Sequence, residues 1–348
     1  MLKFEFIKND IENIWQDYLN GKVIIANSTI LVTGATGLIG SMTCRTLSYL
    51  SAKKGLNLKI LALVRNIDKA KNLLDDVLQF DNIEFVESDI VKSLDEIKDT
   101  VDYIIHTACP TASNVFVGKP VETILSIVQG TANIMELARR CGIKSVVYLS
   151  SMEAYGQVLH ENLLKPEDVG YVNPLSLRSC YPEGKRMAEN LCVSYFSEYE
   201  VPVKAVRLAQ TFGPGILAND GRVFAQFMNS VKNEENIVMF TEGGSKRMYL
   251  DTMDAISAIL VVLFKGESGQ VYNVGNKHNY SSIREMAELV INAFGNGKSE
   301  LVIDKTKDIG QYPPDNMLRL DVSKLEELGW MPKYSLKDMY IRMMDTIK

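Results

Sequence analysis

Short apolar runs alternate with longer amphipathic stretches between about residues 29 and 207 of the chain. The apolar runs predict β-strands at Ile30–Thr33, Lys59–Val64, Ile83–Val86, Tyr103–Thr107, Ser145–Leu149 and Val203–Arg207. The stretches between them predict helices near Ser41–Lys53, Ile67–Leu78, Val121–Cys141 and Gly184–Tyr199. Near-continuous apolar strands joined by crossover helices are typical of a parallel sheet buried on both faces. We therefore expect a doubly wound α/β fold, which binds its ligands beyond the carboxyl ends of the strands.

Two further regions flank this sheet. Apolar residues between positions 10 and 19 recur at helical spacing, which predicts a short amphipathic helix ahead of the main fold. Beyond Gly213 the strands shorten, and small helices are predicted at Val223–Val231, Asp254–Phe264, Ser282–Phe294 and Ser323–Leu328. This pattern predicts a smaller lobe that packs on the sheet and shares a cleft with it. We therefore divide the chain into a helical extension (1–28), a sheet domain (29–212) and a smaller α/β lobe interleaved with it (213–348).

Composition narrows the class of protein. The 348 residues are 46% hydrophobic with a net charge of −5, which excludes a disordered chain and argues against a nucleic-acid binder. No apolar run nears the roughly 20 residues of a membrane helix, and the first ten residues lack a signal-peptide core, so we expect a cytoplasmic protein. The five cysteines form no CxxC pair and the three histidines no ligand spacing. Free thiols and no metal site are therefore expected.

A glycine-rich turn stands where a dinucleotide-binding loop belongs, after the first predicted strand and before the first helix. Gly34 would make the tight turn, Gly37 would let the backbone approach a pyrophosphate, and Gly40 would let the helix pack closely on the strand. The helix N-terminus offers unpaired N–H groups and a positive dipole end to the phosphates. The predicted cofactor contacts in this loop are Gly34, Thr36, Gly37, Leu38, Ile39 and Gly40. The motif specifies the fold as Rossmann-like and the cofactor as NAD or NADP.

The end of the second strand bears on which of these cofactors is used. NAD-selective sites usually place Asp or Glu there for the ribose 2′-hydroxyl, but this chain has Arg65. A guanidinium suits a 2′-phosphate by charge and geometry, which favours NADP(H); the alternative is that Arg65 is a solvated loop residue. Asp89 and Ile90, after the third strand, are expected to contact the adenine.

Tyr181 and Lys185 lie four residues apart and therefore on one helix face. A free tyrosine hydroxyl has a pKa of about 10, and a nearby ammonium with a cationic nicotinamide would lower it. Tyr181 could then exchange the proton of a sugar hydroxyl while hydride moves to or from the nicotinamide. Ser151, just past a strand, would hold the reacting oxygen. Glu153 is a candidate second acid or base, or else a solvated loop carboxylate.

Taken together, these motifs resemble the extended short-chain dehydrogenase/reductases, also known as the NAD-dependent epimerase/dehydratase family. The similarity runs from about Thr29 to the C-terminus and is carried by GATGLIG (34–40), HTAC (106–109), SSMEAYG (150–156), YPEGK (181–185), RLAQTFGP (207–214), RMYLD (247–251) and LGWMP (328–332). Within the family the chain most resembles UDP-glucuronate decarboxylases, through 172–174, 178–186 and 220–223. The resemblance implies a nucleoside-diphosphate sugar substrate whose nucleotide is held by the C-terminal lobe. Relatives are usually homodimers through the helices near 121–141 and 184–199.

The resemblance also implies roles for individual residues. It implies catalysis by Ser151, Glu153, Tyr181 and Lys185, and a cofactor contact at Ala108. It implies substrate contacts at Asn173, Arg178, Gln210, Arg222, Arg247 and Tyr249. Arginines near a diphosphate are chemically reasonable, because a guanidinium binds phosphate with two parallel hydrogen bonds.

Departures from the family pattern shape the predicted reaction. Met152 stands where sugar 4,6-dehydratases carry Asp, and Gln210 replaces a usual Asn. Together with Arg65, Met152 favours an NADPH-dependent reductase of a nucleotide-linked keto sugar, in the synthesis of surface-polysaccharide precursors. The alternatives are an enzyme that recycles NAD internally (a UDP-glucuronate-type decarboxylase, an epimerase or a dehydratase) and a non-catalytic cofactor-sensing protein. The intact Ser151, Tyr181 and Lys185 argue against the sensor.

Overall fold

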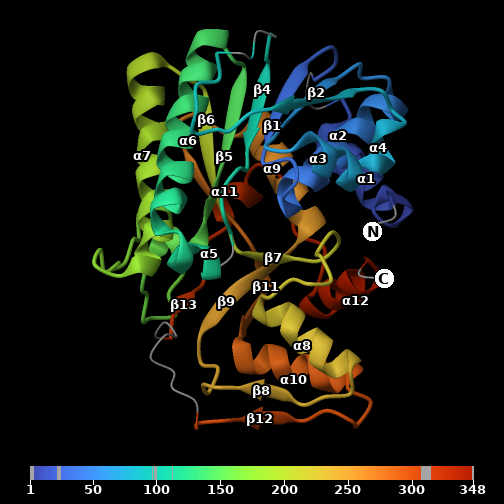
Figure 1. The fold of residues 1–348 in the computed structure, drawn as a ribbon, viewed down its shortest axis with the longest axis vertical. Helices are drawn as coiled ribbons and strands as arrows, with labels where there is room; N and C mark the ends of the chain where they lie inside the picture. Colours follow the sequence, from blue (N-terminus) through green and yellow to red (C-terminus); the bar gives the residue numbers. More distant parts are fainter. Residues whose placement is uncertain are drawn as a thin grey trace.

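A seven-stranded parallel sheet forms the centre of the computed structural model, which describes residues 4–21, 25–95, 97, 100–111, 113–306 and 315–346. The strand order is β10-β6-β5-β4-β1-β2-β3 (Figure 1). The strands are β1 (Thr29–Thr33), β2 (Lys59–Val64), β3 (Ile83–Glu87), β4 (Tyr103–His106), β5 (Ser145–Ser151), β6 (Val203–Leu208) and β10 (Val271–Val274). The predicted Rossmann-like α/β fold is therefore confirmed.

Both faces of the sheet are covered by helices, as the apolar strands require. On β1, Ile30 and Val32 join the apolar layer of α2 (Leu38–Lys54) and α9 (Thr252–Lys265). Leu31 joins the opposite layer, with α6 (Pro120–Cys141) and α7 (Cys180–Tyr199). The shorter helices of this part are α3 (Ile67–Leu73), α4 (Asp75–Leu78) and α5 (Ser113–Gly118).

The prediction from the sequence was wrong at one helix and missed one strand of the central sheet. The helix expected over Ile67–Leu78 is split at Leu74, because the buried Arg45 binds the Leu73 carbonyl oxygen (2.6 Å) and the Asp76 carboxylate (2.8 Å). The missed strand is β10, which pairs with β6 at the sheet edge. Because α9 and β10 follow the first strands of the smaller lobe, the chain enters that lobe and then returns to the sheet.

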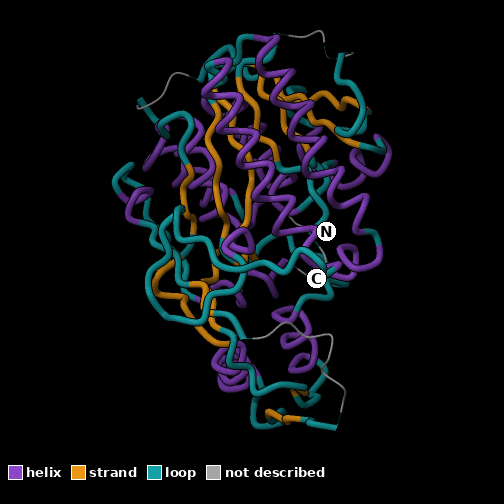
Figure 2. The backbone as a smooth tube through the Cα atoms, turned by 90° about the vertical axis from the view of Figure 1, so that its left-hand side faces the viewer, coloured by secondary structure: helices purple, strands orange, loops and turns teal. Residues whose placement is uncertain are grey.

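The smaller lobe extends from one end of the sheet (Figures 1 and 2). Strands β7 (Gln210–Phe212), β9 (Lys246–Asp251), β11 (Asn276–Ser282) and β13 (Met317–Leu318) form one of its sheets, and β8 (Ile237–Met239) and β12 (Leu301–Ile303) form a second. Its helices are α8 (Val223–Lys232), α10 (Ile283–Phe294) and α12 (Leu336–Thr346), whereas α11 (Ser323–Glu326) packs against β10 of the central sheet. The core of the smaller lobe is apolar and holds Phe212, Phe224 and Tyr249.

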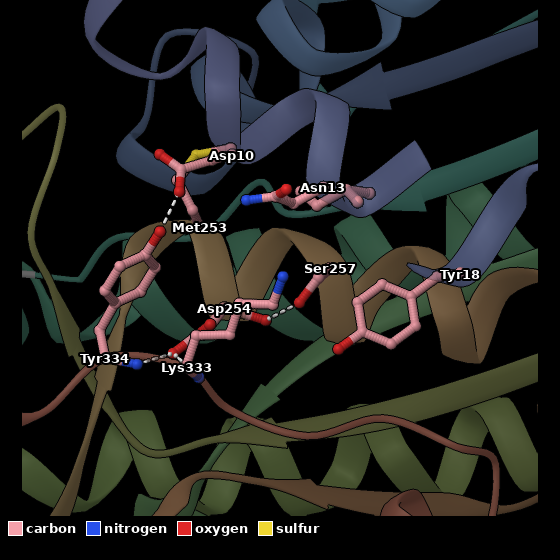
Figure 3. Close-up of a pocket in the computed structure, with 9 residues that line it drawn as sticks. Asp10, Asn13, Tyr18, Met253, Asp254, Ser257, Lys333 and Tyr334 are labelled. Carbon is pink, nitrogen blue, oxygen red and sulfur yellow. Dashed lines mark hydrogen bonds between the residues drawn. The ribbon is translucent and has the colours of Figure 1, made fainter. Parts of the chain in front are cut away.

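The expected N-terminal helix is present as α1 (Lys8–Ile14), which continues as a π-helical turn over Trp15–Leu19. Its buried Asp10 accepts hydrogen bonds from Tyr334 and from Arg342 (3.0 Å), and Arg342 also donates to Asp251 (3.0 Å). Figure 3 shows the adjoining pocket, where Asp10 of α1 points to the Tyr334 hydroxyl and Asp254 of α9 lies at the backbone of Lys333 and Tyr334. The first and last helices are thus joined through one buried cluster of charges.

In the part of the chain that the structure describes, no helix combines the length and the apolar character needed to span a lipid bilayer.

Candidate active site

The loop between β1 and α2 is shaped by glycines. Gly34 has a φ angle of +64°, and a Cβ atom there would lie 2.8 Å from the Ala108 Cα atom. A Cβ atom on Gly40 would lie 2.2 Å from the Gly34 carbonyl oxygen, so only glycine lets α2 approach β1 this closely. Gly37 precedes α2 without a capping side chain, and no acid occupies the first turn. This positive helix end fits the pyrophosphate of a dinucleotide.

The helix begins at Leu38, three residues before the predicted Ser41, so Leu38 and Ile39 belong to its first turn. Both are half-buried, as is Thr36 in the loop itself. The backbone N–H groups of Thr36, Leu38 and Ile39 therefore lie where the loop meets the helix, which is where the sequence predicts the phosphates.

The ends of β2 and β3 carry the other expected cofactor residues. Arg65 is exposed just after β2, and its neighbour Asn66 uses its side-chain oxygen to cap α3 (2.7 Å from the Lys69 nitrogen). Asp89 is half-buried, and one of its carboxylate oxygens accepts the Val91 N–H (3.1 Å). Ile90 is buried. The residue that follows β2 is thus Arg65, and not the Asp or Glu of NAD-selective sites.

Hydrogen bonds tie the glycine loop to the next strand. The Thr33 hydroxyl oxygen accepts the N–H groups of Thr107 and Ala108 (3.1 Å each) and contacts the Nδ1 atom of His106 (2.7 Å). His106 also contacts Thr131 of α6 (3.3 Å). Burial, with the nearby Lys185 charge, lowers the pKa of His106 to about 3, so this imidazole is neutral. Its role is structural, because it links Thr33 of β1 to Thr131 of α6.

The three motif residues of the expected catalytic group lie together at the end of β5 and the start of α7. Tyr181 and Lys185 are buried on α7, and Ser151 is the last residue of β5. The Lys185 ammonium donates to the Leu149 carbonyl oxygen of β5 (2.6 Å), which fixes the lysine against the strand.

Tyr181 occupies an enclosed environment. Burial raises the pKa of its phenol well above the ordinary value, and the nearby Cys109 and Glu153 raise it further, whereas a hydrogen bond with Ser151 lowers it. The ring of Phe116 is stacked on the Tyr181 ring, with centroids 4.3 Å apart. Activation of this phenol therefore requires positive charge beside it.

Glu153 does not stand alone in the structure. It lies in a 3-10 turn after β5 and accepts two hydrogen bonds from the Arg178 guanidinium (2.9 and 3.1 Å). Both side chains are about one-third exposed or less (27% and 33%). Met152, by contrast, is 3% exposed and packs in the core. The turn after β5 and the segment before α7 thus place one carboxylate and one guanidinium next to Tyr181.

The other expected substrate residues lie in the loop before α7 and in the smaller lobe. Asn173 is exposed, and Arg222 is paired with Asp220 (2.6 Å). Gln210 of β7 is paired in register with Tyr249 of β9, which is only 2% exposed and packs in the lobe core. Arg247 of β9 is half-buried, and its buried Nε atom has no hydrogen-bond partner among the described residues. An anion at Arg247 would satisfy that group.

Sequence reasoning missed two features of this site. Phe116 comes from α5, and no local signal connects it to Tyr181. A buried ion pair joins Glu189, one turn beyond Lys185, to Arg207 of β6 (2.6 and 2.9 Å), and the Ser150 hydroxyl donates to the same carboxylate. This pair fastens α7 to β5 and β6, the strands behind the catalytic residues.

Comparison with known proteins places the chain among nucleotide-sugar enzymes. The model of the NAD dependent epimerase/dehydratase family matches residues 30–275. UDP-glucuronic acid decarboxylase 6 of Arabidopsis thaliana is 30% identical over 325 residues, covering 92% of this chain and 88% of the relative. UDP-glucuronic acid decarboxylase 1 of Xenopus tropicalis is 28% identical over 311 residues, covering 89% of this chain and 69% of the relative.

Solved structures agree on the fold. A dTDP-glucose 4,6-dehydratase of Streptomyces venezuelae with NAD bound has a TM-score of 0.75 at 22% identity, covering 91% of this chain and 96% of that one. A UDP-glucuronic acid 4-epimerase of Bacillus cereus, in complex with UDP-glucuronic acid and NAD, also has a TM-score of 0.75, at 20% identity, covering 91% and 98%.

Proposed function

Because this chain belongs to the NAD-dependent epimerase/dehydratase family, we propose that it decarboxylates a nucleoside-diphosphate uronic acid while recycling a bound NAD. UDP-glucuronate is the first substrate to test, because relatives named for its decarboxylation match 92% of the chain. The observation that carries the proposal is the Glu153–Arg178 pair beside Tyr181, combined with the burial of Met152. We expect the dinucleotide in residues 29–212 and the nucleotide sugar against residues 213–348.

The chain's own residues would move the protons. Tyr181, as phenolate, takes the proton of the substrate hydroxyl, while Ser151 holds the oxygen and the Lys185 ammonium stabilises the phenolate. A bound NAD, held by the glycine loop of residues 34–40, would supply the acceptor and later the donor of the hydride at that carbon. The oxidised carbon is then a ketone two bonds from the carboxylate carbon.

A carboxylate β to a ketone leaves as carbon dioxide, and the electrons of the broken C–C bond pass into an enolate. No acid is needed to expel a hydroxyl group, which suits a turn where position 152 is a buried methionine. The Arg178 guanidinium can bind a substrate carboxylate, either together with Glu153 or in place of it. The enolate carbon takes a proton from solvent water; hydride return to the ketone carbon and proton return from Tyr181 to its oxygen then give a nucleotide-linked pentose.

The decisive experiment offers UDP-glucuronate to the purified protein and measures carbon dioxide together with the nicotinamide absorbance. Carbon dioxide release without net formation of NADH supports decarboxylation with internal recycling. Tyr181→Phe is the matched control, because it removes one hydroxyl and leaves the ring stacked on Phe116. If wild-type protein and Tyr181→Phe both release no carbon dioxide from any nucleotide-linked uronic acid, this function is refuted.

Arg65 supports a second candidate. An exposed guanidinium after β2, where NAD-selective sites usually carry Asp or Glu, suits the 2′-phosphate of NADPH and hence a net reduction of a nucleotide-linked keto sugar, as in the synthesis of surface-polysaccharide precursors. Oxidation of added NADPH with a keto-sugar nucleotide, weakened by Arg65→Ala, would favour this reductase. Protein that is purified with NAD and ignores NADPH would exclude it.

We also propose that the chain forms a homodimer through α6 and α7. Val121 and Leu125 of α6 and Met187, Val193 and Phe196 of α7 are each more than one-third exposed. Large apolar side chains gathered on two neighbouring helices are typical of an interface. Light scattering should give twice the chain mass, and Leu125→Lys with Met187→Lys should give the monomer.

A further inference from the structure

Tyr148 lies in the middle of β5 and faces the start of the catalytic helix. The centroid of its ring is 4.9 Å from the Lys185 Nζ atom, and the Tyr181 ring is 5.7 Å from the same atom. The Leu149 carbonyl oxygen accepts one Lys185 hydrogen bond (2.6 Å). Among the described residues, no carboxylate lies within ion-pair distance of Lys185. The ammonium is therefore held by one carbonyl group, by the Cys109 thiol and by the faces of two aromatic rings.

The ring of Tyr148, and not its hydroxyl, makes these contacts. Tyr148 is 2% exposed, and its hydroxyl has no hydrogen-bond partner within the described ranges. Burial holds the pKa of this phenol well above its ordinary value, so it stays neutral. Its ring also contacts the His106 imidazole, with centroids 5.6 Å apart. A phenylalanine would supply every contact that Tyr148 supplies.

The titratable groups around Tyr181 and Lys185 come from several elements. They are His106 of β4, Cys109 after β4, Glu153 and Arg178 before α7, and Cys180, Glu189 and Cys192 of α7. His106 is neutral, and burial raises the pKa of the cysteine thiols. The two carboxylates are each paired with an arginine. Lys185 is thus the cation in this group that has no carboxylate to neutralise it.

We infer that Tyr148 is a positioning residue, whose ring face holds the Lys185 ammonium beside the Tyr181 hydroxyl and so sets how readily that hydroxyl ionises. A desolvated cation over a ring face is more strongly held than an exposed one. Replacing the Tyr148 ring with an aliphatic side chain removes the nearer of the two rings and leaves the ammonium with the Leu149 carbonyl, the Cys109 thiol and the more distant Tyr181 ring. The inference rests on the proposed catalytic roles of Tyr181 and Lys185.

The first test needs no substrate. Phenolate absorbance is titrated in saturating NAD, and the Tyr181→Phe spectrum is subtracted in each background, which isolates the ionisation of Tyr181. Tyr148→Leu should move that ionisation to higher pH by about one unit. Tyr148→Phe, the conservative variant, should restore the wild-type titration. Tyr148→Met gives the same comparison if the leucine variant does not fold.

The second test is the pH dependence of carbon dioxide release from UDP-glucuronate. Its acid limb should move to higher pH in Tyr148→Leu, with activity near pH 7 falling about tenfold and recovering in alkali. A merely structural defect would lower activity equally at every pH. The inference is overturned if the ionisation of Tyr181 moves in neither variant, or in both. If it moves only in the leucine variant while wild-type protein releases no carbon dioxide, the inference stands and the decarboxylase proposal fails.

Discussion

Glu189→Gln should destabilise the protein far more than its conservative chemistry suggests. The Glu189 carboxylate accepts two hydrogen bonds from Arg207 (2.6 and 2.9 Å) and one from Ser150. The side chains of the pair are only 8% and 5% exposed. The amide keeps one acceptor oxygen and removes the negative charge, so the Arg207 guanidinium stays buried without a counter-ion.

The cost follows from that geometry. Breaking a buried ion pair on one side typically costs about 3–5 kcal/mol, because the remaining charge is desolvated and uncompensated. At an m-value of about 3 kcal/mol per molar urea, the unfolding midpoint should fall by about 1 M or more. Equilibrium unfolding in urea, followed by circular dichroism, measures this shift.

Two control variants sharpen the reasoning. Glu234→Gln breaks the Lys298–Glu234 pair, whose side chains are 57% and 61% exposed, and should change the unfolding free energy by less than about 1 kcal/mol. Replacing both members of the buried pair, with Glu189→Met and Arg207→Met, should recover part of the loss, because no lone charge remains. A cost below about 1 kcal/mol for Glu189→Gln, or a double variant as unstable as the sum of the single ones, would refute the argument.

Three further predictions concern the cofactor loop, the phenol and the buried charges. Gly34→Ala should abolish NAD binding in calorimetry, because the added Cβ atom would lie 2.8 Å from the Ala108 Cα atom in a left-handed backbone conformation; unchanged affinity would contradict the loop assignment. Tyr181→Phe should lose turnover while binding NAD normally, and residual turnover above about one-hundredth of wild type would remove Tyr181 from its role. Burial, with Asp251 nearby, raises the pKa of Asp254 to about 7, so the folded protein binds its proton more tightly than the unfolded chain does. The stabilisation from that proton is complete below about pH 4 and is lost as the pH rises through about 7, at up to about 1.4 kcal/mol per pH unit; Asp254→Asn should flatten this dependence in urea unfolding at pH 5, 6 and 8.

What the sequence could predict is what short-range patterns encode. Six strands of the central sheet are near-continuous apolar runs, and the glycine loop and the Tyr181–Lys185 spacing are local motifs. The seventh strand was missed because it contains Asn273, a poor strand former. In the fold, its side chain donates to the Leu164 and Asp321 carbonyl oxygens, 109 and 48 positions away.

The same limit applies to the site. Tyr181 and Lys185 are recognisable because they are four residues apart, whereas the partners that control them come from other elements. Phe116 reaches Tyr181 from α5, and Tyr148 reaches Lys185 across the β5–α7 contact. Arg178 was expected to bind substrate, and its pairing with Glu153, 25 positions away, could not be read from either residue. These contacts depend on tertiary packing, which no local spacing reports.

The buried bond between Asp10 and Arg342 has a consequence for synthesis. The two residues are 332 positions apart, and a ribosome adding about 5–20 residues per second needs roughly twenty seconds to a minute to cover that distance. Throughout that time the newly made first helix lacks its guanidinium partner, and it also lacks the apolar surface of α9 until Thr252–Lys265 have been made. A nascent chain therefore carries this amphipathic helix without α9 until residue 265 has been made and Asp10 without its partner until residue 342 has been made, and chaperone contact with the segment should weaken in these two stages.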